Sequence, residues 1–177
     1  MTPPQMQLFF AALTLATLVA AVALIVVRIA ALRSPAARAL LVTLSPACLP
    51  LAALIATTSM VGSLYFSEVA NYLPCTLCWY QRIAMYSLAV ILTIAAFARD
   101  KQSRRYAMTL SGLGIVISSY HYLLERFPQL DTGVCNTTIP CEYVWFERFG
   151  FVTLPFMALT GFIAIFALAS IRPPAQQ

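Results

Sequence analysis

The sequence predicts an all-α integral membrane protein: a four-helix transmembrane bundle with one additional transmembrane helix at the N-terminus. Of its 177 residues, 61% are hydrophobic and only 10% are charged, whereas soluble domains carry about 25% charged residues. Five apolar segments approach the roughly 20 residues that a helix needs to cross a bilayer. Most of the eleven basic residues lie between these segments, where basic residues set the orientation of a membrane protein.

Each apolar segment is predicted to cross the membrane once. The first, second and fifth segments contain no charged residue, the third contains only Arg82, and the fourth contains His121, the single histidine of the chain. Pro46 and Pro50 lie inside the second segment, so a kink is expected there. The predicted spans are residues 7–27, 40–66, 79–98, 107–124 and 152–171.

The basic residues predict the orientation of the spans. If the spans alternate, eight of the eleven basic residues fall on one side, which the positive-inside rule identifies as the cytoplasm; they are Arg28, Arg33, Arg38, Arg99, Lys101, Arg104, Arg105 and Arg172. The N-terminus is then outside and the C-terminus cytoplasmic. Residues 1–6 lack the basic start of a signal peptide, so the first segment is predicted to remain as a span. The chain divides into residues 1–39, an N-terminal helix with a cytoplasmic loop, and residues 40–177, a four-helix membrane domain.

Two cysteine pairs lie on the predicted outer side. Cys75 and Cys78 form a Cys-x-x-Cys pair where the third span begins, and a helix N-terminus lowers a thiol pKa and favours the reactive thiolate. Arg82 follows Cys78 by one helical turn and lies on the same helix face. Cys135 and Cys141 lie in the longest loop of the chain. These features point to redox chemistry at a membrane surface.

Three interpretations of the four outer cysteines stay open at this point. They can form two structural disulfides, an all-cysteine zinc site, or a relay in which one disulfide oxidises the other by thiol–disulfide exchange. An oxidising compartment disfavours zinc, and a Cys-x-x-Cys pair at the start of a membrane helix favours the relay. Cys48, in the second span without a partner on its side, is expected to act only as a small buried hydrophobe.

Several segments carry a family resemblance. Residues 74–82 read Pro-Cys-x-Leu-Cys-x-Tyr-Gln-Arg and resemble the signature of the DsbB-type disulfide bond formation proteins. Residues 62–68, the Pro-Cys dipeptide at 140–141 and the segment 149–159 resemble the BdbC branch of that family. Residues 121–128 resemble the stretch between the two cysteine pairs. The resemblance covers about two thirds of the chain, in the expected order.

The resemblance implies a quinone-dependent thiol-disulfide oxidoreductase of the bacterial plasma membrane, with both cysteine pairs on the outer face. A reduced, secreted DsbA-like thiol oxidase would attack the second pair at Cys135, electrons would pass to the first pair, and Cys78 would donate to ubiquinone or menaquinone. The predicted catalytic residues are Cys75, Cys78, Cys135 and Cys141. Arg82, Gln81 and His121 are the predicted quinone-binding residues, and no metal is expected.

Two features depart from the family pattern. The family usually has four spans, so residues 7–27 are an addition, and only five residues separate Cys135 from Cys141, which matches the BdbC branch. Other classes compete with this prediction: a membrane assembly protein with stapling disulfides, a transporter or metal-handling protein, which would need mid-membrane polar residues, or a protein of the vitamin K epoxide reductase type. The basic residues form no patch interleaved with aromatic residues, so no nucleic-acid partner is expected.

Overall fold

The computed structural model describes residues 2–98, 100, 102–135 and 139–171, and within these residues the chain forms five α-helices and no β-strand. A π-helix over Tyr65–Val69 continues the second helix, and a 3-10 turn over Pro128–Leu130 follows the fourth. The all-α prediction is confirmed. The helices are α1 (Pro3–Ala30), α2 (Pro35–Leu64), α3 (Thr76–Ala98), α4 (Ser103–Arg126) and α5 (Leu154–Ala169).

The first four helices are long and apolar enough to cross a membrane, whereas α5 is shorter than predicted. The expected span was 152–171, but the helix covers 16 residues, or about 24 Å at 1.5 Å per residue. Val152 is excluded because its backbone exchanges two hydrogen bonds of 2.9 Å with Arg148. Thr153 is extended, and Pro155 occupies the first turn, where its missing N–H costs nothing.

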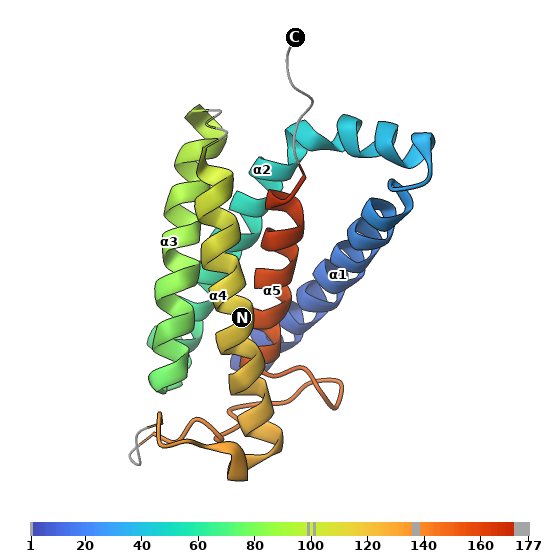
Figure 1. Ribbon diagram of the computed structural model, residues 1–177. Coiled ribbons are helices and arrows are strands. Elements are labelled where there is room, and N and C mark those ends of the chain that lie inside the picture. The colour runs from blue at the N-terminus through green and yellow to red at the C-terminus, as the bar shows by residue number, and fades with distance from the viewer. Residues whose placement is uncertain (1, 99, 101, 136–138, 172–177) are drawn as a thin grey trace.

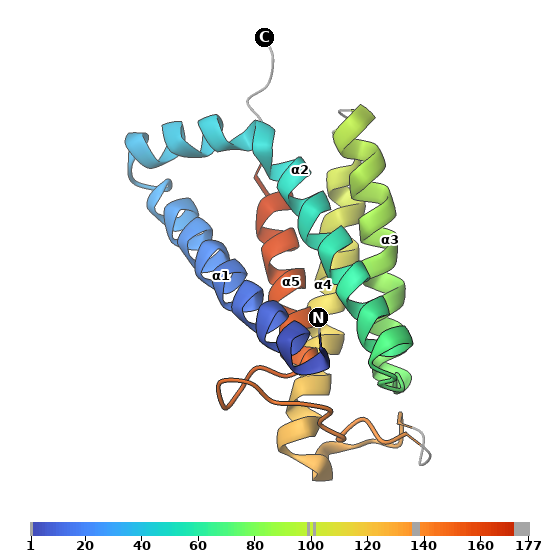
Figure 2. The same cartoon turned by 180° about the vertical axis from the view of Figure 1, so that it is seen from behind.

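The second helix bends, as its prolines predict. Pro46 and Pro50 lie inside α2, and each removes a backbone donor and crowds the preceding turn. Figures 1 and 2 show the first part of α2 lying across one end of the molecule before the helix turns to run beside α3 and α5. At this end the Arg28 side chain of α1 still reaches the Ser170 hydroxyl, which follows α5.

The core of the bundle lies between α2, α3, α4 and α5. Leu88 and Leu92 of α3 and Phe162 and Ile165 of α5 are fully buried in it. Gly114 of α4 allows the close approach of α5, because a Cβ at this position would lie 2.4 Å from the Phe162 ring. Small residues serve this purpose in membranes, where helix association depends on close packing.

One end of the bundle gathers the segments that carry the cysteines. Helices α1, α3 and α5 begin there, α4 ends there, and the loop between α4 and α5 folds over it (Figure 1). We call this the cysteine end. Helix α1 is fastened to it by Gln7, whose side chain donates to the Tyr72 hydroxyl at 2.6 Å and accepts from Arg148 Nη2 at 2.6 Å.

Candidate functional site

The Cys-x-x-Cys pair lies at the start of α3, at the cysteine end. The Cys75 carbonyl accepts the first backbone hydrogen bond of the helix, from Trp79 N at 3.1 Å. The backbone N–H of Cys78 points at Cys75 Sγ, 3.3 Å away, and the two sulfurs are 2.7 Å apart. The first turn of the helix thus holds the two thiols in contact, ready to close a disulfide.

The second pair, Cys135 and Cys141, forms a disulfide in the loop that covers the cysteine end. Cys141 is 1% exposed, and it packs in one small apolar cluster with Cys75, Leu77 and Leu124. The structure therefore brings the two pairs together, although about 60 residues separate them in the sequence. The disulfide also removes two of the four thiolates that an all-cysteine zinc site would need.

His121 of α4 connects the two pairs. Its Nε2 lies 3.1 Å from the Cys141 carbonyl oxygen and 3.6 Å from Cys75 Sγ, and its Nδ1 lies 2.8 Å from Gln81 Nε2. A carbonyl can only accept, so Nε2 carries the proton, and Nδ1 accepts from the Gln81 amide. This tautomer aims an N–H at the region that Cys75 and Cys141 share, and both Gln81 and His121 are buried.

The electrostatic setting favours the thiolate of Cys75, which lies just outside the membrane-spanning part of α3. A hydrogen bond from the Cys78 thiol lowers the pKa of Cys75 below its usual range; burial opposes this effect, and His121 reinforces it. Cys75 is thereby prepared for exchange, since the thiolate is the reacting form of cysteine.

The lowered pKa of Cys75 predicts a distinctive pH dependence of its alkylation in the fully reduced protein. Ordinary thiols lose their thiolate as the pH falls below about 8.5. Because the pKa of Cys75 is lowered to about 4, its thiolate should persist through mildly acidic pH and disappear only as the pH approaches 4. Iodoacetamide alkylation, followed by peptide mass spectrometry, should place the midpoint of Cys75 well below the value of about 8.5 of an ordinary thiol. A Cys75 midpoint at that ordinary value would contradict the assignment.

Arg82 faces α2 and does not contact the cysteines directly. Its Nε donates to Ser63 Oγ at 3.0 Å and its Nη2 to the Ser63 carbonyl at 3.0 Å, while its guanidinium lies 5.3 Å from the centre of the Trp79 ring. The Tyr86 hydroxyl also donates to Ser63 Oγ. These contacts fix one edge of the guanidinium and hold its charge at the wall of a cavity.

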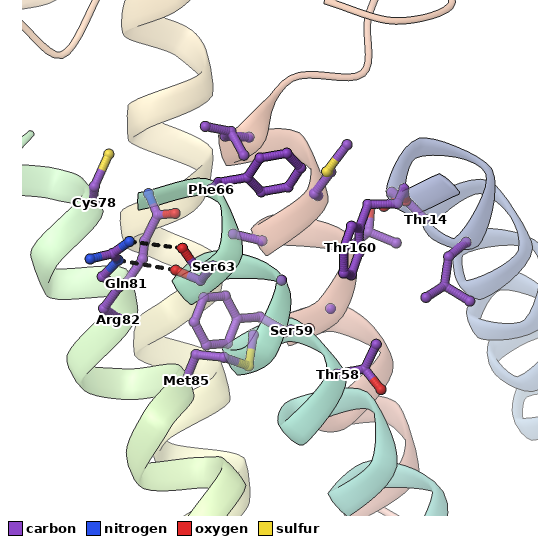
Figure 3. A pocket seen from close by; sticks show the side chains of 18 of the residues that line it. Thr14, Thr58, Ser59, Ser63, Phe66, Cys78, Gln81, Arg82, Met85 and Thr160 are labelled. Carbon is purple, nitrogen blue, oxygen red and sulfur yellow. Dashed lines mark hydrogen bonds between the residues drawn. The ribbon is translucent and has the colours of Figure 1, made fainter. Parts of the chain in front are cut away.

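That cavity has a volume of about 530 Å³, within the roughly 300–1,000 Å³ of small-molecule sites. Cys78, Gln81 and Arg82 line one side of it, and Thr14 of α1 lies on the opposite side (Figure 3). The remaining walls come from α2, α5 and the aromatic segments at the cysteine end, and most of them are apolar. The site joins one sulfur, one amide and one cation to a space suited to an apolar ligand.

The predicted site residues divide between this cavity and the thiol cluster. Cys78 belongs to both. Gln81 lines the large cavity and contacts His121, whereas His121 lies among the cysteines and does not line that cavity. Ligand atoms of Cys75, Cys78 and His121 lie within 4.8 Å of one another, but a closed zinc site takes four ligands, and the described residues add no fourth to this group. Cys48 lies apart, buried in the bundle core, with its Sγ 3.4 Å from the Leu44 carbonyl oxygen.

Sequence reasoning missed two residues of the site. Ser63, the partner of Arg82, lies in a segment that drew attention only through the family resemblance. Glu125 lines a small cavity of about 10 Å³ beside Cys75, Cys78 and His121, and its Oε2 has no hydrogen-bond partner among the described residues. The sequence carried one signal for Glu125: it lies one helical turn after His121, the sole histidine.

Comparison with known proteins identifies the family. The model of the family described as disulfide bond formation protein DsbB matches residues 45–169. The chain belongs to the DsbB family. The match includes all the predicted site residues, confirms the resemblance noted in the sequence, and leaves α1 outside its bounds. No solved structure matches the chain.

The relatives found include members of the BdbC branch. The chain is 44% identical to the disulfide bond formation protein C of Bacillus subtilis over 113 residues, which are 63% of this chain and 81% of the relative. It is 47% identical to a probable disulfide formation protein C of Halalkalibacterium halodurans over 114 residues, which are 64% of this chain and 83% of the relative. A probable disulfide formation protein of Oceanobacillus iheyensis is 43% identical over 112 residues, 62% of this chain and 77% of the relative. Membership in this family supports a disulfide-forming role in the membrane.

Proposed function

We propose that the protein re-oxidises a secreted DsbA-like dithiol protein and passes the electrons to a membrane quinone. One observation carries this proposal: the two cysteine pairs share one buried cluster, and Cys78 opens from that cluster onto an apolar cavity lined by Arg82. A disulfide that only stapled a loop would need neither the second pair nor the cavity.

The first step is thiol–disulfide exchange at the loop. A thiolate of the reduced partner attacks Cys135 Sγ, the Cys135–Cys141 bond breaks, and Cys141 leaves as a thiolate. Partial exposure of Cys135 and full burial of Cys141 support this choice of the attacked sulfur. The second partner thiol then displaces Cys135, so the partner leaves oxidised and the loop pair is reduced.

The second step moves the electrons to the inner pair. A loop thiolate attacks Cys75 Sγ of the Cys75–Cys78 disulfide, and a second exchange restores the Cys135–Cys141 bond and leaves Cys75 and Cys78 reduced. The N–H of His121 stabilises the thiolate of Cys75 during these exchanges.

The third step returns the inner pair to its disulfide. When bound, a quinone accepts the two electrons and two protons that Cys75 and Cys78 give up. The cavity fits such a molecule because it is mostly apolar and because Arg82 retains N–H donors beyond those that Ser63 accepts. Arg82 and Gln81 would bind polar atoms of the ligand, and Cys78 would supply the electrons as the Cys75–Cys78 bond forms.

The proposed orientation places the cysteine end outside the cytoplasmic membrane. The described basic residues at the other end of the bundle support it, because an excess of basic residues marks the cytoplasmic side; they are Arg28, Arg33, Arg38, Arg104 and Arg105. A DsbA-like partner would then meet the exposed loop from the outer side.

One assay tests both the reaction and the orientation. Reduced DsbA-like protein is added to right-side-out or inverted membrane vesicles that contain the protein, and quinone absorbance is followed. Right-side-out vesicles should reduce quinone at once, and inverted vesicles only after detergent opens them. Activity confined to inverted vesicles would reverse the orientation. No activity in either, even in detergent, would overturn the reaction and favour a non-catalytic assembly role.

A further inference from the structure

We propose that α1 is part of the acceptor site, and that it binds the isoprenoid tail of the quinone across the cavity from Cys78 and Arg82. This inference rests on the proposed function. It concerns the helix that the family match leaves out, since that match begins at residue 45. It assigns a role to the predicted additional span and names the chemical class of the acceptor: a quinone with a long apolar tail.

Helix α1 forms a substantial part of the cavity wall. Its contribution comes from one face near its N-terminus, where Thr14 is buried and Phe9 and Leu13 are partly exposed. Figure 3 shows Thr14 across the cavity from Cys78, Gln81 and Arg82. The α1 residues that line the cavity are Phe9, Phe10, Leu13, Thr14 and Thr17.

This wall presents little polarity to a ligand. Thr14 Oγ1 donates to the Phe10 carbonyl at 2.8 Å and Thr17 Oγ1 to the Leu13 carbonyl at 2.8 Å. Both hydroxyls are thus satisfied within the helix, and the rest of the α1 lining is aromatic or aliphatic. An isoprenoid chain offers no hydrogen-bonding group, so it is matched to this side of the cavity, whereas ring oxygens are matched to the Arg82 side.

The position of α1 is fixed where it meets the cavity. Phe10 packs over Gly62 of α2 so closely that a Cβ at Gly62 would lie 2.6 Å from its ring, and Phe10 also contacts the Phe66 ring at 5.7 Å between centroids. Gln7 ties the start of the helix to Tyr72, three residues before Cys75, and to Arg148 in the cysteine loop. These contacts therefore fix the position of the α1 wall relative to the thiols.

The test compares one substitution in the wall with a matched one outside it. Thr14→Phe adds a ring to a buried position on the cavity face, whereas Val19→Phe adds the same ring to a residue that is 70% exposed and lines no part of the cavity. Quinone binding is measured by quenching of tryptophan fluorescence, because Trp145 lines the cavity. Two ligands are titrated: a quinone with an isoprenoid tail and the same ring without a tail.

We expect Thr14→Phe to weaken binding of the tailed quinone by about tenfold or more, as overfilling a packed site does, and to leave the tail-less ring within about twofold. Val19→Phe should match the unsubstituted protein for both ligands. Equal behaviour of the two variants, or an equal loss for both ligands, would overturn the role of α1 while leaving quinone binding intact. Failure of the unsubstituted protein to bind either quinone would instead overturn the proposed function. A trapped mixed disulfide between Cys135 and the partner checks that Thr14→Phe still folds.

Discussion

Replacing both Cys135 and Cys141 with serine should abolish quinone-linked oxidation of the partner. In the proposed relay, electrons enter only through the disulfide that these residues form. The inner sulfur Cys75 is 5% exposed and lies beneath the loop, so a partner thiolate cannot reach it directly. Cys75→Ser and Cys78→Ser should abolish the same activity, because the inner pair then cannot form a disulfide. The measurement is partner oxidation coupled to the change in quinone absorbance.

A substitution of the remaining cysteine provides the control for this result. Cys48→Ser should be nearly silent, because Cys48 lies in the bundle core away from both pairs, and a serine hydroxyl can keep the contact with the Leu44 carbonyl. The double variant should also retain quinone binding, since neither Cys135 nor Cys141 lines the large cavity. Full activity in the Cys135→Ser/Cys141→Ser protein would eliminate the relay.

Arg82→Ala should raise the apparent KM for quinone by about tenfold to a hundredfold. A hydrogen bond to a charged group contributes about 1.5–3 kcal/mol, and Arg82 is the cation that lines the cavity beside Cys78. The KM of Arg82→Lys should lie between those of the unsubstituted protein and Arg82→Ala, because lysine keeps the charge but loses the planar pair of donors. Exchange between the partner and the Cys135–Cys141 disulfide should persist in both variants, since it needs no quinone.

Ser63→Ala tests the hydrogen bonds that hold Arg82 in place while keeping the charge of Arg82. The guanidinium donates to both the hydroxyl and the carbonyl of Ser63, and the alanine variant removes only the hydroxyl. It should therefore raise KM much less than Arg82→Ala does. Trapping the mixed disulfide alongside the KM measurement reports whether the fold and the first exchange survive. An unchanged KM in Arg82→Ala would remove Arg82 from the acceptor site and leave Gln81 as the polar candidate.

Much of the candidate site could be predicted because its signals are local. The Cys-x-x-Cys spacing and the arginine one turn later depend only on helical geometry, and the structure places Cys78, Gln81 and Arg82 together at the cavity. His121 was expected among the acceptor residues but lies between Cys75 and Cys141. Its neighbours come from two other segments of the chain, which no periodicity within α4 could reveal.

By itself, the sequence determined the membrane class and the approximate helices, and it predicted redox chemistry for the thiols. Those features follow from apolar length, from the cost of placing charge in lipid, and from contacts within one or two helical turns. Only the tertiary structure decided how α1 packs. A membrane helix is apolar on its lipid-facing and protein-facing sides alike, so hydrophobicity does not reveal the packed face. Helix α1 exposes Val19 and Val26 and buries Ala11 and Thr14, so size and shape complementarity place it against the cavity.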